Sequence, residues 1–101
     1  MAKKIFDATE ILDRLTGDDP ELREMIAEEA VNAQVARMIY EARTAAGLTQ
    51  KQLAVMLGTQ QSAIARLEDA DYEGHSLGML RRIAEALNQR LEVRFVPHRA
   101  A

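Results

Sequence analysis

The chain has 101 residues, enough for one compact domain with at most an appended segment. It is 48% apolar and 29% charged, which is typical of a soluble globular protein, and it has no cysteine for a disulfide or a thiolate metal site. The net charge of −3 is unevenly spread: residues 1–30 hold four basic and nine acidic residues, whereas residues 31–101 hold nine basic and seven acidic ones. The acidic excess therefore belongs to the front segment.

Several function classes are disfavoured. Two tyrosines, two phenylalanines and no tryptophan are too few for a protein that stacks single-stranded bases. The opening MAKKIFDATE lacks the apolar stretch of a signal peptide, and no run of residues is suited to span a membrane, so we expect a cytoplasmic protein. His75 and His98 lie far apart and lack metal-ligand spacing, and no glycine-rich phosphate loop occurs. We expect no enzyme activity, no cofactor and no metal.

Residues 1–30 form an acidic extension. A first helix is predicted within IFDATEILDRLTG, where Asp7 or Thr9 can cap it and Gly17 ends it. Two interpretations stand: an extra helix packed on the domain, or an arm that binds a partner protein. The apolar anchors of such an arm are Ile11, Leu12, Leu15, Leu22, Met25 and Ile26.

A long helical segment follows. Asp19 and Pro20 suit a helix start, and residues 21–46 contain no glycine or proline and many good helix formers. The segment is predicted to form either one long helix or two helices with a bend near residues 30–32. From residue 31 on, we assign it to the main domain, residues 31–101. The face that begins this domain's bundle is Val35, Ile39, Ala42 and Ala46.

The stretch GLTQKQLAVMLGTQQSAIARLE predicts helix, tight turn, helix. Thr49 and Gln52 have the spacing of a capping box at the start of the first helix. Gly58 supplies a left-handed residue at its end, and Thr59 is predicted to cap a second helix that starts at Gln60. The inward-facing apolar positions are Leu53, Leu57, Ile64 and Leu67.

The second helix begins with polar side chains. Glutamine can pair with both the N6 and N7 positions of adenine, and helices of this motif present their first residues to base edges. A merely solvated helix start is the alternative, but the caps, glycines and apolar spacing together favour DNA. The start of the preceding helix can meet phosphate. The candidate DNA-binding residues are Thr49, Gln50, Lys51, Thr59, Gln60, Gln61, Ser62 and Arg66.

The end of the chain combines a loop, a helix and one strand. Tyr72 and His75 lie in an acidic loop, where they either touch a phosphate or are simply solvated. Ser76 is predicted to cap the next helix, and Asn88 to end it in a left-handed conformation.

Residues 91–96 alternate in polarity, which predicts a half-buried strand that Pro97 stops. A lone strand needs a partner, and a second copy of the chain can supply it. Leu91, Val93 and Phe95 are the candidate dimerisation residues, and a two-fold homodimer suits a palindromic operator. The predicted fold is all-α, with about five helices and one short C-terminal β-strand paired across a dimer.

The helix-turn-helix stretch resembles those of phage repressors and the wider xre-type (Cro/C1) regulators. The resemblance covers residues 35–88 and implies sequence-specific binding of double-stranded DNA, with repression as its result. It also implies that Arg43 and Glu68 pair across the domain, and that Gln61 and Ser62 are the base-contacting pair. The matching residues are Arg43, Gly47, Leu48, Thr49, Gln50, Leu53, Ala54, Gly58, Gln61, Ser62, Ile64, Leu67 and Glu68.

A second resemblance is to HigA-type antitoxins. It rests on the acidic front with DPELRE, on IYEARTAAGLTQ and AIARLED, and on the final LEVRFVP. It implies a type II toxin-antitoxin pair, in which the chain neutralises a RelE/HigB-like ribonuclease and represses the shared operon. The alternative is a stand-alone xre-family regulator with no toxin partner.

Overall fold

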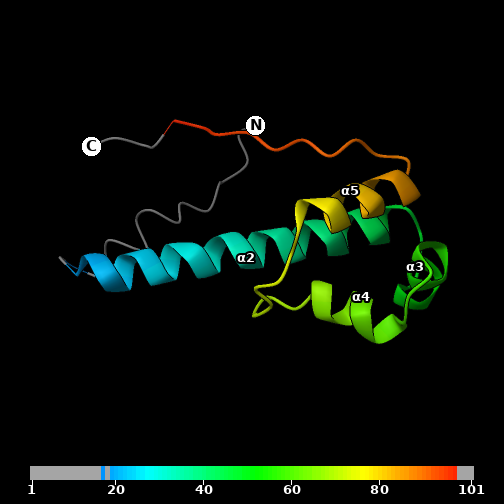
Figure 1. Ribbon diagram of the computed structural model, residues 1–101, viewed down its shortest axis with the longest axis horizontal. Helices are drawn as coiled ribbons and strands as arrows, with labels where there is room; N and C mark the ends of the chain where they lie inside the picture. The colour runs from blue at the N-terminus through cyan, green and yellow to red at the C-terminus, as the bar shows by residue number, and fades with distance from the viewer. Residues whose placement is uncertain (1–16, 18, 98–101) are drawn as a thin grey trace, which may run out of the picture.

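The computed structural model describes residue 17 and residues 19–97. This part of the chain contains the helices α2 (Pro20–Ala45), α3 (Gln50–Leu57), α4 (Gln61–Leu67) and α5 (Leu77–Ala86), as Figure 1 shows. The all-α class is therefore confirmed. The helix expected before Gly17, with the anchors Ile11, Leu12 and Leu15, lies outside the described residues.

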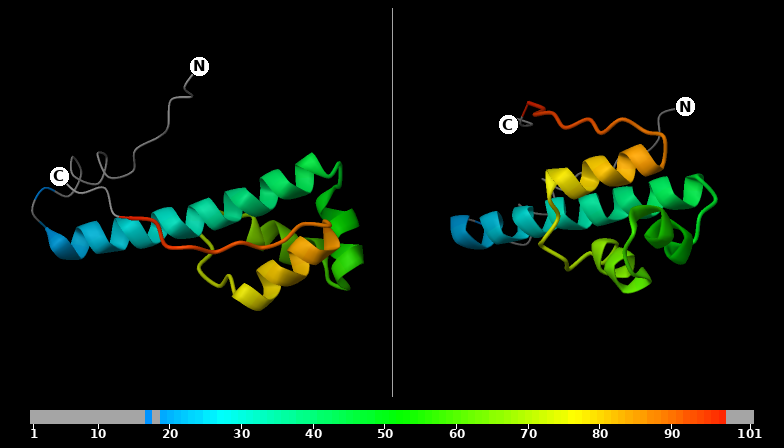
Figure 2. Two further views of the ribbon diagram at one scale, coloured as in Figure 1. Left: turned by 90° about the horizontal axis from the view of Figure 1, so that it is seen from above. Right: turned by 45° about the vertical axis from the view of Figure 1, so that its right-hand side comes forward.

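The segment after Asp19 forms one long helix, so of the two alternatives the single helix is correct (Figure 2). The side-chain oxygen of Asp19 accepts from the amides of Glu21 and Leu22 at 3.1 and 3.2 Å, and Pro20 occupies the first turn, where its missing N–H costs nothing. The helix continues across the predicted boundary between residues 30 and 31. The division into an extension and a domain stays a prediction.

Only the second half of α2 contributes to the core. Its buried residues are Ala36, Ile39 and Arg43, and the half-buried Val35 and Ala42 pack beside them. Ala46, predicted to share this face, is instead exposed, because the helix ends there and Ala46 is its C-cap.

The capping box at the start of α3 is confirmed. The Thr49 hydroxyl accepts from the Gln52 amide at 3.0 Å, and the Gln52 side chain accepts from the Thr49 amide at 2.8 Å. Gly58 ends α3 with φ of 67°. The predicted cap of α4 is wrong by one residue: the amide of Thr59 still closes α3 by donating to the Ala54 carbonyl at 2.9 Å. Gln60 is the actual N-cap of α4, and its side chain makes no capping bond.

The helices share one apolar core. α3 packs on both α4 and α5, and α2 adds Ile39. The largest fully buried side chains are Ile39, Leu53 and Ile64, one each from α2, α3 and α4. The remaining buried members of this cluster are Ala54, Leu57, Leu67, Leu80, Ile83 and Leu87.

The chain end leaves α5 as predicted but forms no strand by itself. The Ser76 hydroxyl caps α5 by accepting from the Met79 amide at 3.1 Å, and Asn88 is left-handed with φ of 57°. Residues 89–97 then run back over α2 without regular structure in this single chain (Figures 1 and 2). Leu91 packs against the core, whereas Val93 and Phe95 are exposed. The predicted pairing with a second copy stays a prediction.

Candidate nucleic-acid interface

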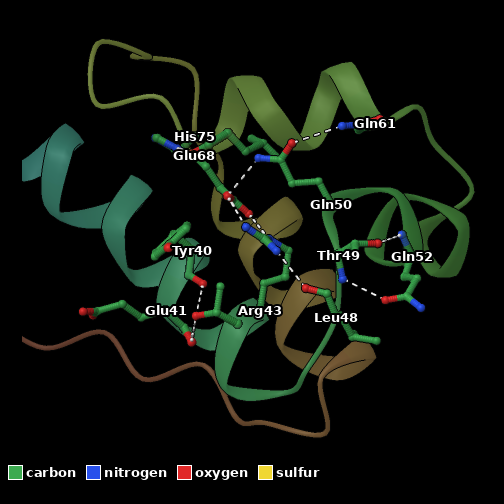
Figure 3. A network of polar contacts seen from close by, with 12 residues as sticks. Tyr40, Glu41, Arg43, Leu48, Thr49, Gln50, Gln52, Gln61, Glu68 and His75 are labelled. Carbon is green, nitrogen blue, oxygen red and sulfur yellow. Dashed lines mark hydrogen bonds and ion pairs between the residues drawn. The ribbon is translucent and has the colours of Figure 1, made fainter.

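The first turns of α3 and α4 meet at the surface. Nε2 of Gln61, the first residue of α4, donates to Oε1 of Gln50, the first residue of α3, at 3.4 Å (Figure 3). The structure thus brings together the residue predicted to contact bases and one predicted to contact phosphate. Gln50 is half-buried. The other candidate DNA-binding residues, all exposed, are Thr49, Lys51, Thr59, Gln60, Gln61, Ser62 and Arg66.

The charge on this surface suits a polyanion despite the negative net charge. No acidic residue occurs between Glu41 and Glu68, a stretch that includes the whole of α3 and α4. The cations within these two helices, Lys51 and Arg66, are both exposed. Glu68 itself is neutralised, because it pairs with Arg43 inside the domain. Phosphate would therefore meet positive charge here without opposing carboxylates.

The ion pair that the resemblance implies is present. Nε of Arg43 donates to Glu68 Oε2 at 2.6 Å and its Nη2 donates to Glu68 Oε1 at 3.0 Å, so the guanidinium holds both carboxylate oxygens. The two side chains are only 9% and 5% exposed. The hydrogen bonds that Arg43 donates to Glu68 raise the pKa of Arg43, against the opposing effect of burial. The pair therefore ties α2 to the end of α4 as a buried, charged contact.

Further contacts fix this junction. Nη1 of Arg43 donates to the Leu48 carbonyl at 2.7 Å, which holds the turn before α3. The Arg43 guanidinium also lies 5.4 Å from the centre of the Tyr40 ring, a cation–π distance. Nε2 of Gln50 donates to Glu68 Oε1 at 3.1 Å. The sequence predicts neither contact. Tyr40 and Arg43 lie three positions apart on α2, whereas the bond from Gln50 to Glu68 depends on how the helices cross.

In the loop after α4, the side chains of Tyr72 and His75 pack against the protein. Nε2 of His75 lies 2.7 Å from the Leu67 carbonyl, and its half-buried ring meets Tyr72 edge-on with centres 4.9 Å apart. A Cβ on Gly74 would collide with the phenol end of Tyr72, so an alanine there would require that ring to shift. The two roles considered for His75, phosphate contact and plain solvation, are both wrong. His75 closes the end of α4 instead.

Other kinds of site receive no support within residue 17 and residues 19–97. That part of the chain has no group of three metal-ligating side chains close enough to hold an ion. None of the helices described there has the length and apolar character needed to cross a membrane.

The helix-turn-helix geometry agrees with the comparison to known families. A family model described as a helix-turn-helix domain matches residues 18–95, which includes all four described helices. Searches of curated proteins and of solved structures found no match. The matched span is most of the chain, and it contains the capped α3, the left-handed turn and the exposed start of α4. The chain belongs to the helix-turn-helix domain family.

Proposed function

We propose that the chain is a sequence-specific regulator that binds double-stranded DNA and represses transcription by placing α4 in the major groove. The observation that carries this proposal is the contact between the first turns of α3 and α4, where side-chain amides lie exposed on a surface without acidic residues. Amides in that position suit base edges, and the adjoining cation suits phosphate.

Within this proposal the candidate DNA-binding residues divide into two groups. Gln61 and Ser62 contact base edges, with Thr59, Gln60 and Arg66 beside them on the same helix end and outer face. Thr49, Gln50 and Lys51 at the start of α3 hold the phosphate backbone. Thr49 already uses its hydroxyl oxygen as the helix cap, which fixes the orientation of that turn.

The two groups are expected to fail differently when altered. Gln61→Ala should cost roughly 1–3 kcal/mol on the preferred operator and relax the preference at one base pair. Lys51→Ala should weaken binding to all DNA about equally and reduce the salt dependence by about one unit of slope. Binding curves against a panel of single-base operator variants measure both. A Gln61→Ala protein with the wild-type ranking and affinity would show that this turn does not contact the bases.

We further propose that the regulator is the antitoxin of a type II pair and that the first half of α2 holds the toxin. Before Ala36 no residue of α2 is buried, yet Leu22 is exposed and Met25 is 62% exposed. Met25 lies in a groove of about 260 Å³ whose other lining residues are Glu21, Glu24 and Glu28. An exposed methionine beside three glutamates complements a basic surface such as that of an RNA-binding ribonuclease.

Removing this arm should separate the two activities. Deletion of residues 1–30 should abolish neutralisation of a RelE/HigB-like toxin but leave operator binding intact, because the buried face of α2 begins at Ala36. Growth rescue and operator binding are measured on the same truncated chain. In a matched full-length control, Met25→Lys should weaken rescue alone. Rescue of growth by the truncated chain would show that residues 1–30 are not the toxin-binding arm. Failure of the full-length chain to rescue growth would favour the alternative, a stand-alone regulator with no toxin partner.

A homodimer completes the proposal. A groove of about 280 Å³ lies between α2, α5 and the start of the chain end, with a lining that is mostly apolar. The neighbouring Val93, Phe95 and Val96 are exposed, and Phe95 is fully so. Two copies that pair residues 91–96 as antiparallel strands would cover these side chains and satisfy the strand edges. The groove residues that a second copy would meet are Met38, Ala42, Leu80, Ala84, Leu87 and Leu91.

A further inference from the structure

A directed chain of hydrogen bonds links the surface of α4 to the interior. Gln61 donates to Gln50 at 3.4 Å, Gln50 donates to Glu68 at 3.1 Å, and Glu68 is held by Arg43 (Figure 3). The Glu68 side chain is only 5% exposed, so it cannot itself touch DNA. Its influence on DNA would have to pass through Gln50.

The chemistry of Glu68 fixes the direction of every bond in this chain. A carboxylate paired with a guanidinium only accepts hydrogen bonds, so Gln50 must turn its NH2 group toward Glu68. Its carbonyl oxygen then faces Gln61, and Gln61 must turn its own NH2 group toward Gln50. One of the two Gln61 N–H bonds is thereby used. The groups left for DNA are one N–H and the carbonyl oxygen.

This remaining pair matches adenine better than guanine. In the major groove adenine presents an acceptor, N7, and a donor, the N6 amino group, which one N–H and one carbonyl oxygen satisfy together. Guanine presents two acceptors, N7 and O6, and would need both N–H bonds of Gln61. One of these is bonded to Gln50, and the Gln61 carbonyl would face O6 without a donor.

We propose that Glu68 is a specificity-positioning residue, which selects adenine over guanine at the base pair contacted by Gln61 by setting the orientation of Gln50. The inference rests on the proposed DNA-binding function. It goes beyond that function because it assigns base selectivity to a buried carboxylate whose other role, the pair with Arg43, is structural.

Two variants interrupt the chain at different points. Gln50→Met keeps the length of the side chain and leaves the Arg43–Glu68 pair intact, but removes both hydrogen bonds. Glu68→Gln replaces an acceptor by an amide that donates or accepts, so Gln50 can turn either way. Lys51→Met is the matched control, because it replaces the neighbouring exposed side chain on the same turn and leaves the chain of hydrogen bonds unchanged.

The experiment selects binding sites from a random duplex library with the full-length wild type and each variant, then measures affinities for the selected site with adenine or guanine at each position. For the wild type we expect roughly a tenfold or greater preference for adenine at one base pair of each half-site. Gln50→Met should reduce that preference to about twofold or less, with the other positions unchanged. Lys51→Met should lower all affinities and keep the preference.

The outcomes distinguish the inference from the function beneath it. If the wild type selects no consensus, the proposed sequence-specific binding fails. If it selects one and Gln50→Met keeps the adenine preference, only the role of Glu68 is overturned. Glu68→Gln should relax the same position; a purely structural role would reduce the folded fraction and lower every affinity equally. Because the adenine preference is a ratio of two affinities of one protein, a reduced folded fraction does not change it, and a Glu68→Gln protein with the wild-type ratio would overturn the role of Glu68.

Discussion

At the residue scale, the Arg43–Glu68 contact makes a sharp stability prediction. Glu68→Ala would leave the Arg43 guanidinium buried without its partner, which should cost roughly 3–5 kcal/mol of unfolding free energy. Glu41→Ala is the matched control, since its pair with Arg37 has side chains that are 70% and 61% exposed and should contribute about 0–1 kcal/mol. Thermal melts of both variants measure the difference. Equal melting temperatures would show that the buried pair does not stabilise the fold.

The contribution of Arg43 should be insensitive to pH in the ordinary range. Because the pKa of Arg43 is raised in the folded state, the stabilisation is complete below the unfolded-state pKa. It is lost only as the pH rises through the folded-state pKa. Both values lie far above neutral.

Predictability from sequence varies among the residues of this site. Thr49 and Gln52 were readable because a capping box is local, three residues apart. The Arg43–Glu68 pair came from resemblance to other regulators, since the two residues are 25 positions apart. The sequence predicts Gln50 only as a phosphate contact. Its bond to Glu68 depends on the distance between two helices, which no local pattern encodes.

At the scale of elements, two glycines should respond in opposite ways to the same substitution. Gly58 ends α3 with φ of 67°, and nothing lies within 4 Å of an added Cβ, so Gly58→Ala should destabilise by roughly 1–2 kcal/mol through backbone strain alone. Gly78 is the second residue of α5, also with open space, and Gly78→Ala should stabilise by about 0.4–1 kcal/mol through the lower entropy of the unfolded chain. Urea unfolding of the two single variants measures both signs. A stable Gly58→Ala protein would show that the turn tolerates another geometry.

The elements themselves were largely predictable where local chemistry marks their ends. Asp19 with Pro20 starts α2, and Ser76 starts α5, because each side chain satisfies free amides of its helix. The start of α4 was misplaced because two polar residues, Thr59 and Gln60, both fit a cap. The amide of Thr59 instead donates to a carbonyl at the end of α3. The conformation of residues 91–96 cannot be predicted from their sequence alone. Their alternating polarity predicts a strand but does not identify the strand that would pair with it.

At the scale of the whole molecule, the proposed dimer depends on the chain end. Val93→Pro removes a backbone donor from the pairing strand, and the chain should sediment as a monomer at concentrations where the wild type is a dimer. The control is Val55→Ser, which changes an apolar residue that is likewise exposed but lies on α3. Proline is not used at this position because it would break the helix. The control should leave the mass unchanged. A Val93→Pro dimer would refute pairing through residues 91–96.

The long helix α2 has a consequence for how the molecule opens in solution. Its 26 residues span about 39 Å, yet its buried residues, Ala36, Ile39 and Arg43, all lie in its second half. The amide protons of the second half should exchange with solvent only on global unfolding, whereas those near Leu22 should exchange through fraying from the Pro20 end. A single helix would thus show a gradient of protection along its axis. Any partner that holds the first half of α2 would erase that gradient, and the slowing of exchange would mark how far along the helix the contact reaches.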